Sequence, residues 1–247
     1  MIIEKKMRFN LGQNMLTKTQ PDMVEKVLEQ LQDPRIVEKM IIEIQETLDF
    51  QQLYQAAIRQ VNTKLEILDD EFHFKYDRNP IHHMESRLKS PQSIIEKLYR
   101  KGFEISAKSA QENITDIAGV RVICSYIEDI YSIAKLLKQQ DDVILVRETD
   151  YIRNPKANGY RSLHLVVNVP VYLSDGKELV PVEIQIRTIA MDFWASLEHQ
   201  IRYKGADNIP DELIRELSDC ADVIAKTDLR MQNINRELES IFKPNSY

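Results

Sequence analysis

The chain has 247 residues, of which 43% are hydrophobic, and 33 Lys and Arg face 39 Asp and Glu for a formal net charge of −6. This length and composition predict a globular protein of one large or two small domains. The acidic balance excludes a surface that is basic throughout, so any phosphate site has to be local. With two cysteines, Cys124 and Cys220, a disulfide-stapled scaffold is excluded and a reducing compartment is favoured. No apolar stretch has the length of a signal-peptide core or a membrane span, so we expect a cytoplasmic protein with no membrane partner.

The first third of the chain, residues 1–76, has a composition typical of helices and contains a single glycine, Gly12. Apolar residues recur at helical spacing from Val24 to Leu31, from Ile36 to Leu48 and from Leu53 to Leu68. This pattern predicts three successive helices, which together form a helical N-terminal flank.

Near Ile114 the apolar spacing changes from the helical period to the strand period. The predicted strands cover residues 120–126, 143–151, 163–169 and 182–186. A helix is expected over 130–137, and a turn at Ser174 to Gly176. Short connections with one helical insertion favour a mixed sheet over a doubly wound one. The expected fold is therefore α+β, with its core over 77–205 and all parts in one compact domain.

The C-terminal segment, residues 206–247, contains the most regular pattern in the chain. Pro210, followed by two acidic residues, is typical of a helix start. From Leu213 to Ile241 mostly apolar residues step alternately by four and three positions, which is a heptad pattern. A long helix packed on its own domain gives similar spacing, but about four heptads are longer than the face that such a domain offers. The pattern therefore predicts a helix that associates with other helices in a homo-oligomer.

A local basic cluster extends from Arg87 to Lys101. Ser90 and Pro91 are typical N-cap and first-turn residues of a helix. The polar face of this helix consists of Ser93, Lys97 and Arg100, and the residues expected to face the core are Ile94, Ile95 and Leu98. A hydroxyl with ammonium and guanidinium groups suits a polyphosphate, although a solvated amphipathic helix has the same pattern.

Two carboxylates are candidates for chemistry. Asp116 comes just before a predicted strand, and Glu183 lies within another. Because side chains alternate along a strand, Glu183, Gln185 and Arg187 project from the face opposite to their apolar neighbours. A solvated sheet face explains this alternation equally well. Alternatively, the two carboxylates hold Mg²⁺ against phosphates, since Mg²⁺ prefers one or two carboxylates plus substrate oxygens.

The segment from Tyr151 to His164 combines an Asn-Gly turn signal with several basic residues and an aromatic ring. Tyr160 and His164 have the same strand parity and are expected on the face that points away from the core. A lone surface tyrosine usually serves packing. The basic neighbours of Tyr160 favour a ring that stacks on a base.

Four motifs, in this order, resemble the synthetase domain of the RelA/SpoT-type alarmone synthetases. They are Arg87-x-Lys89-x-x-x-Ser93, Asp116-Ile-Ala-Gly-Val-Arg121, Asn158-Gly-Tyr160-Arg-Ser-x-His164 and Val182-Glu-Ile-Gln-Ile-Arg-Thr188. The same pattern continues through Met191-Asp-Phe-Trp194, Glu198-His199 and Tyr203-Lys204, so the match spans residues 80–204. No hydrolase His-Asp dyad and no regulatory C-terminal extension is recognised. The chain is therefore similar to a stand-alone small alarmone synthetase.

This resemblance implies a nucleotidyltransferase-like mixed sheet and a specific reaction. The family transfers the β,γ-pyrophosphate of ATP to the 3′-hydroxyl of GDP or GTP, which makes (p)ppGpp and releases AMP. The resemblance also implies Mg²⁺ as the cofactor and a homotetramer. Asp116 would bind Mg²⁺, and Glu183 would share the ion or act as general base on the 3′-hydroxyl.

The remaining implied roles divide between the two substrates. Arg87 and Arg121 would enclose adenine. The ATP phosphates would contact Lys89, Ser93, Lys97 and Arg100. Tyr160 would stack on guanine, and the other acceptor contacts would come from Lys156, Arg161, His164, Gln185 and Arg187. Some relatives carry an amide where Asp192 stands, but its carboxylate can accept hydrogen bonds from both N1–H and N2–H of guanine.

Two other functions are compatible with the sequence. One is a non-catalytic guanine-nucleotide or alarmone sensor that signals through its C-terminal helix. Asp116 and Glu183 argue against this sensor, because a pure binder gains little from two acids near phosphates. The other is an RNA-binding protein, which the net charge of −6 makes the lesser alternative.

Overall fold

The computed structural model describes residues 34–75, 78–205 and 209–242. Contacts divide the chain into two units, Met1–Asp49 and Phe50–Tyr247. The helix α3, Pro34–Lys75, begins in the first unit and ends in the second, which also contains all the other elements described below. Among the described helices, none has the length and apolar character needed to cross a membrane.

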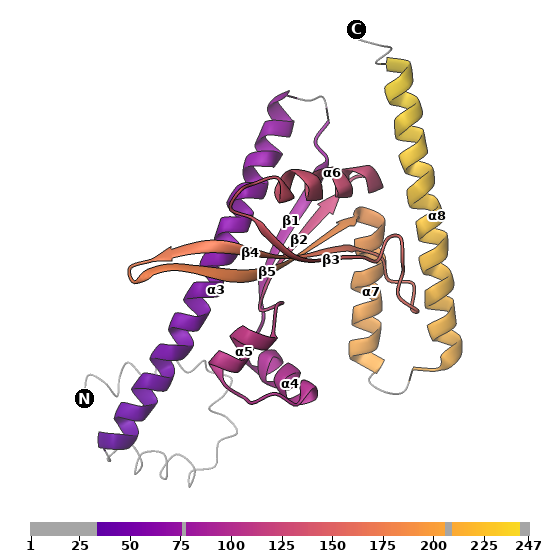
Figure 1. The fold of residues 1–247 in the computed structure, drawn as a ribbon. Helices are drawn as coiled ribbons and strands as arrows, with labels where there is room; N and C mark the ends of the chain where they lie inside the picture. The colour runs from indigo at the N-terminus through magenta and orange to yellow at the C-terminus, as the bar shows by residue number, and fades with distance from the viewer. Residues whose placement is uncertain (1–33, 76–77, 206–208, 243–247) are drawn as a thin grey trace, which may run out of the picture. The chain divides into compact units, whose positions relative to one another are not determined.

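Within the described residues, five strands form one sheet in the order β1-β2-β5-β4-β3 (Figure 1). Their bounds are Ile81–Leu88 (β1), Ala118–Cys124 (β2), Ile144–Asp150 (β3), Leu163–Leu173 (β4) and Gly176–Thr188 (β5). Strands β2 and β5 are parallel, and the other neighbouring pairs are antiparallel. The predicted α+β class with a mixed sheet is therefore confirmed.

The helices after β1 flank this sheet on both sides. Their bounds are Pro91–Lys101 (α4), Ala107–Asn113 (α5), Ile127–Lys138 (α6), Ile189–Gly205 (α7) and Asp211–Phe242 (α8). Helix α6 lies on one side of the sheet, and α4, α5 and α7 lie on the other (Figure 1). Helices α7 and α8 pack against each other.

The core lies on the α6 side of the sheet. Alternate residues of the central strands, such as Val120, Leu165 and Ile184, are buried together with Val61 of α3 and Ile133 of α6. The residues between them carry polar side chains to the other face. This alternation, which the sequence predicts, leaves a polar surface between α4 and α7 for the candidate site.

Several elements agree closely with the sequence-based expectations. The expected strands correspond to β2, β3, β4 and β5, of which β4 and β5 are longer than predicted, and the expected helix at 130–137 corresponds to α6. Pro91 opens α4, where the side chain of Ser90 accepts a hydrogen bond from the backbone N–H of Ser93. The heptad segment forms one helix, α8, that begins just after Pro210.

Three expectations differ from the structure. Residues 36–48 and 53–68 belong to one helix, because no glycine or proline interrupts the chain between them. Strand β1 was not predicted, since its polar residues show no apolar alternation. Ile95 is 46% exposed, because the buried stripe of α4 follows the i, i+4 pair Ile94 and Leu98 instead. The helix expected over 24–31 lies outside the described residues.

Candidate active site

The strand register arranges polar side chains in two rows across the face between α4 and α7. In the first row, Arg87 of β1 pairs with Gly119 of β2, and Gly119 pairs with Glu183 of β5. The second row consists of Glu85, Arg121, Gln185 and His164. Because directly paired residues project from the same face, four neighbouring strands contribute to one site.

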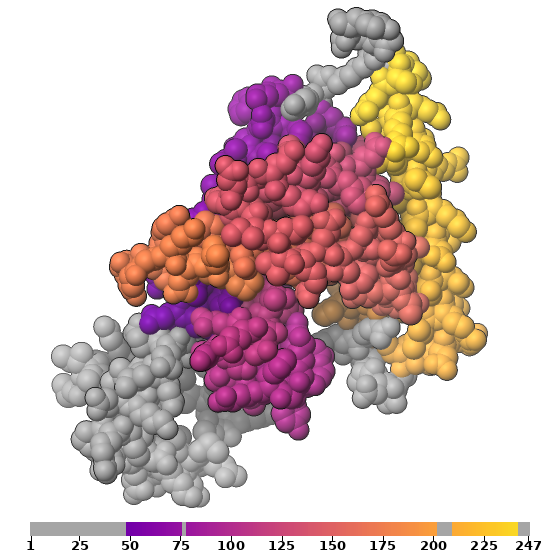
Figure 2. Space-filling view, in the orientation of Figure 1, coloured from indigo at the N-terminus to yellow at the C-terminus, as the bar shows by residue number. Residues whose placement is uncertain are grey.

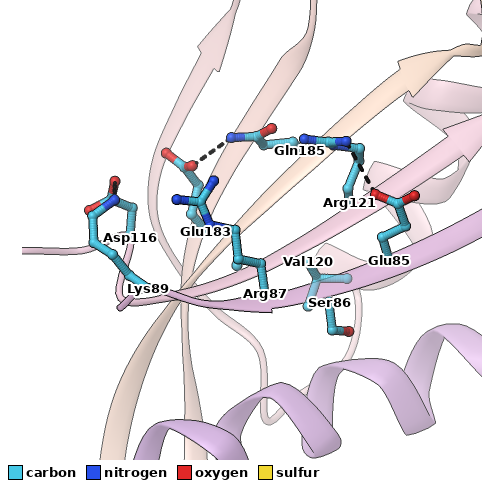
Figure 3. A pocket seen from close by; sticks show the side chains of 10 residues that line it. Glu85, Ser86, Arg87, Lys89, Asp116, Val120, Arg121, Glu183 and Gln185 are labelled. Carbon is cyan, nitrogen blue, oxygen red and sulfur yellow. Dashed lines mark hydrogen bonds and ion pairs between the residues drawn. The ribbon is translucent and has the colours of Figure 1, made fainter. Parts of the chain in front are cut away.

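A cavity of about 160 Å³ lies over these rows (Figure 3). Its charged and amide lining consists of Glu85, Arg87, Lys89, Asp116, Arg121, Glu183 and Gln185. Pockets that enclose a whole small-molecule ligand usually have volumes of about 300–1,000 Å³. The cavity is therefore large enough for only part of a nucleotide, with the rest outside it.

Asp116 lies between two lysines at one end of the site. It accepts hydrogen bonds from Lys89 at 3.0 Å and from Lys97 of α4 at 2.7 Å. Burial acts to raise the pKa of Asp116, but the hydrogen bonds and charges of these lysines outweigh burial and hold the pKa below its usual value. The structure thus places an ionised carboxylate among the predicted phosphate-binding lysines.

Glu183 belongs to a closed ring of side-chain contacts. Gln185 donates to Glu183 at 2.8 Å and accepts from Arg187 at 2.6 Å. Arg187 also donates to the hydroxyl of Tyr160 at 2.6 Å. That hydroxyl lies 2.8 Å from Nε2 of His164, and Nδ1 of His164 lies 3.6 Å from Oε1 of Glu183. The ring joins the cavity to the predicted acceptor residues.

The charge of Glu183 follows from these contacts. Burial acts to raise the pKa of Glu183, but the nearby His164 and the hydrogen bond from Gln185 outweigh it and hold the pKa below its usual value. Glu183 is therefore an ionised carboxylate near neutral pH, as Asp116 is. Such a group can accept a hydrogen bond or a proton, or help to hold a cation.

An aromatic cluster adjoins the ring. Tyr151 contacts Tyr160 and His164 edge-on, with ring centroids 5.9 Å and 5.2 Å apart. The Nζ atom of Lys156 lies 4.7 Å from the ring centroid of Tyr151 and 4.6 Å from that of Tyr160. Burial raises the pKa of Tyr160, although Arg187 partly opposes the effect, so its hydroxyl stays neutral. Sequence reasoning did not single out Tyr151, whose signal is its place at the start of the same basic loop.

Asp192, in the first turn of α7, connects the two halves of the site. Its Oδ1 lies 3.1 Å from Arg187 and 3.5 Å from Arg121. Arg121 also pairs with Glu85 at 3.2 Å, a residue that sequence reasoning missed because β1 was not predicted. Among the described side chains, the buried Nε atoms of Arg121 and Arg187 have no hydrogen-bond partner. Buried donors without a partner are rare in proteins, and these two lie at the same site.

Of the predicted site residues, Ser93, Arg100 and Arg161 lie outside both the cavity lining and the contacts described above. The hydroxyl of Ser93 accepts a hydrogen bond from that of Ser90 at the start of α4, and Arg100 is exposed in the last turn of α4. The guanidinium of Arg161 contacts α8, where it lies 3.3 Å from the carbonyl oxygen of Ala221.

The site combines two ionised carboxylates with lysines and arginines in and around one small cavity, beside an aromatic cluster. On a mixed sheet, this combination defines an enzyme that acts on nucleotide phosphates. Comparisons with known proteins agree. Residues 86–208 match the family described as "Region found in RelA / SpoT proteins".

Two curated relatives cover most of the chain. GTP pyrophosphokinase YwaC of Bacillus subtilis (strain 168) is 49% identical over 76% of this chain and 89% of its own length. GTP pyrophosphokinase YjbM of the same strain is 36% identical over 75% of this chain and 87% of its own length. The chain therefore belongs to the small alarmone synthetases, the RelA/SpoT-type family that its sequence motifs resemble.

Solved structures show the same relationship. Small alarmone synthetase 2 from Bacillus subtilis superimposes with a TM-score of 0.71 at 46% identity, and covers 78% of this chain and 99% of its own. Small alarmone synthetase 1 from the same organism, bound to its product pppGpp, has a TM-score of 0.70 at 35% identity and covers 74% of this chain and 93% of its own. The fold predicted from the family resemblance is thus confirmed.

Proposed function

We propose that this protein transfers the β,γ-pyrophosphate of ATP to the 3′-hydroxyl of GDP or GTP, releasing AMP and forming (p)ppGpp. The observation that carries this proposal is the connection between two subsites. Asp116, Lys89 and Glu183 line the cavity, and Lys97 contacts Asp116 from α4. Glu183 is linked through His164 to Tyr160. Both carboxylates favour catalysis over a non-catalytic sensor, and the GTP pyrophosphokinases named above support this activity.

The two substrates take different parts of the site. Lys89 and Lys97 hold the ATP phosphates, with Ser93 and Arg100 on the same helix face of α4, and Arg87 and Arg121 enclose adenine. On the acceptor side, Tyr160 stacks on guanine, and Asp192 accepts hydrogen bonds from the guanine edge. The remaining acceptor contacts come from Lys156, His164, Gln185 and Arg187.

In the chemical step, the acceptor 3′-oxygen attacks the β-phosphorus of ATP. The bond between that phosphorus and the α,β-bridging oxygen breaks, and AMP leaves with the electron pair. The proton of the 3′-hydroxyl passes to a carboxylate oxygen of Glu183. The cations around the cavity offset the charge that develops on the phosphates, which is the main requirement of phosphoryl transfer.

Asp116 and Glu183 fit Mg²⁺ because both are ionised and both line one cavity. Within the described residues, no group of three or more His, Cys, Asp or Glu side chains is arranged to hold a metal alone. A site of two carboxylates completed by substrate phosphates is the arrangement that Mg²⁺ favours. When bound, the ion would neutralise phosphate charge.

The exposed face of α8 supports a homo-oligomer, and the family resemblance favours a tetramer. The heptad residues Leu213, Met231, Ile234, Leu238 and Ile241 are between 43% and 63% exposed. A neighbouring face of α8, with Ala221, Asp228 and Gln232, is buried. Exposed apolar residues at heptad spacing favour an interaction surface. The free thiols of Cys124 and Cys220 support a cytoplasmic location.

Product analysis tests the activity. The protein is incubated with ATP labelled in the β- and γ-phosphates and with GMP, GDP or GTP in turn, with ADP as the control acceptor. We expect label in a guanine nucleotide and one AMP for each product molecule. Release of ADP, or binding of both nucleotides without transfer, would contradict the proposal.

A further inference from the structure

The acceptor loop, residues 151–162 between β3 and β4, packs against α8. Figure 2 shows the surface that follows β3 in direct contact with the surface of α8. Arg161 makes this contact with both terminal nitrogens of its guanidinium group. Nη1 donates to the carbonyl oxygen of Gly159 at 3.1 Å and to that of Ala221 at 3.3 Å, and Nη2 donates to Asp222 at 3.1 Å.

The fit between loop and helix is close at Gly159. This residue has a φ of +88°, and a Cβ atom at its position would lie 2.5 Å from the Cβ of Ala221. Tyr160, the next residue, packs against the buried cluster of Trp194, Ala195 and Ala221. Small side chains at 159 and 221 therefore allow the loop to approach α8 closely enough for Tyr160 to reach that cluster.

Hydrogen bonds within the loop hold its shape, so its contacts with neighbouring helices determine its position. The backbone N–H of Gly159 donates to Lys156, and that of Lys156 donates to Tyr160. At the turn, the side chain of Asn158 donates to Glu198 of α7 at 3.0 Å. Arg161 supplies the attachment to α8, directly beside the ring that is proposed to stack on guanine.

We propose that Arg161 is a positioning residue that fastens the acceptor loop to Ala221 and Asp222 of α8, and that α8 thereby sets the affinity for the guanine-nucleotide acceptor. This inference rests on the proposed function. It assigns Arg161 a role through Tyr160 in place of the direct acceptor contact that the family resemblance implies. It also predicts that changes confined to α8 act on one substrate and not on the other.

The test compares three variants with a matched control. Arg161→Met removes the guanidinium, Ala221→Leu pushes the loop away from α8, and Asp222→Asn removes one charge. Asp219→Asn changes an exposed carboxylate on the same helix away from these contacts. For each protein, KM is measured for ATP and for GDP, GDP affinity is measured by calorimetry, and the melting temperature is recorded.

We expect Ala221→Leu and Arg161→Met to raise the KM for GDP by about 10-fold or more, because small displacements of a substrate-positioning group cost up to about 10²-fold. Asp222→Asn should change the KM for GDP by less than about 5-fold, since exposed ion pairs contribute little free energy. The KM for ATP should stay at the wild-type value in all of them, and Asp219→Asn should match the wild type.

Two results would overturn the proposal. If Ala221→Leu leaves GDP binding intact while Arg161→Met weakens it, Arg161 contacts the nucleotide directly. If both KM values rise together with a fall in melting temperature, α8 is only a structural support. Should Ala221→Leu fail to fold, Asp222→Arg decides the question, because it repels the Arg161 guanidinium from α8. The attachment predicts a raised KM for GDP with the KM for ATP at the wild-type value, and a wild-type KM for GDP would overturn the proposal. Failure of the proposed reaction is distinguishable, since GDP calorimetry reports on the loop without turnover.

Discussion

The guanidinium of Arg187 donates a 2.6 Å hydrogen bond to the hydroxyl of Tyr160, which ties the acceptor loop to strand β5. Arg187 is only 4% exposed, and it also donates to Gln185 and Asp192. The Tyr160 ring is therefore held by its hydroxyl as well as by the cluster under it. Because Gln185 contacts Glu183, the same arginine connects the proposed guanine position with the proposed proton acceptor.

Replacing Tyr160 should separate stacking from this hydrogen bonding. Tyr160→Ala should weaken acceptor binding by about 1–3 kcal/mol, the usual contribution of base stacking, and leave ATP affinity unchanged. Tyr160→Phe keeps the ring but leaves the buried guanidinium of Arg187 with one partner fewer, which should lower the free energy of unfolding by about 1–3 kcal/mol. Calorimetric titration with each nucleotide measures the change in binding, and urea titration measures the change in stability. An equal loss of ATP and acceptor binding would indicate a packing role for the ring.

Replacing the two carboxylates should separate proton transfer from metal binding. Glu183→Gln should lower turnover by about 10²- to 10⁴-fold, the range for a lost general base, with nucleotide binding retained. Asp116→Asn is the comparison, since its predicted role is metal binding alone, and excess Mg²⁺ should partly restore its activity. A Glu183→Gln protein that responds to Mg²⁺ as Asp116→Asn does would identify Glu183 as mainly a metal ligand. Wild-type turnover of Glu183→Gln would remove this residue from the mechanism.

Lys97→Met should act on ATP alone. The ammonium of Lys97 is one of two that hold Asp116, and hydrogen bonds to charged groups contribute about 1.5–3 kcal/mol. The KM for ATP should rise accordingly, while the KM for GDP stays near the wild-type value. Lys101→Met, on the same helix but exposed, provides the control in steady-state assays. A matching rise in the KM for GDP would argue that Lys97 serves both subsites.

The heptad face of α8 should hold the oligomer together. Ile234→Asp combined with Leu238→Asp places two charges in the proposed apolar seam and should lower the mass measured by light scattering, because buried unpaired charge is costly. Asn233→Asp adds a charge at an exposed position outside the seam and should leave the mass unchanged. If the double variant keeps the wild-type mass, α8 is not the interface.

Asp228 should make stability depend on pH. It is buried in α8 beside Thr188, and burial raises the pKa of Asp228 above its usual value despite the hydrogen bond from Thr188. Its contribution to stability is therefore full at pH values below the unfolded pKa and is lost as pH rises through the folded pKa. Asp228→Asn should raise the unfolding free energy at neutral pH and weaken its pH dependence, as measured by urea titration at several pH values. If the pH dependence of the unfolding free energy is unchanged in Asp228→Asn, the carboxyl of Asp228 does not contribute to it.

Much of the fold follows from residue patterns. Alternation predicts β2 and β5 and places Glu183, Gln185 and Arg187 on the polar face, and turn and cap signals locate the start of α4. Strand β1 is not predicted, because its apolar and polar side chains do not alternate, and Glu85 is therefore missed as well. The apolar runs at 36–48 and 53–68 predict two helices, although no residue between them ends a helix, and α3 is continuous there.

The site was less predictable, because its contacts join segments that are distant in sequence. The sequence motifs contain both Arg161 and Trp194, but nothing in them indicates that α8 lies against the acceptor loop. Asp192 pairs with Arg121 only because α7 begins at the end of β5, beside β2. Likewise, the sequence alone does not show which residues of α8 form the exposed heptad stripe and which form the buried polar face. That distinction depends on the neighbours of each residue in the fold.

The parallel pairing of β2 with β5 has a consequence for the order in which the enzyme folds. These strands are separated in the chain by α6, β3 and β4, whereas β4 and β5 are joined by a turn at Ser174 and Asp175. Contacts between distant segments bear a larger loop-closure cost and form later than local hairpins. Asp116 and Glu183 lie on opposite sides of this late pairing. The two carboxylates of the site are therefore expected to come together only when β2 and β5 pair, after the β4–β5 hairpin has formed.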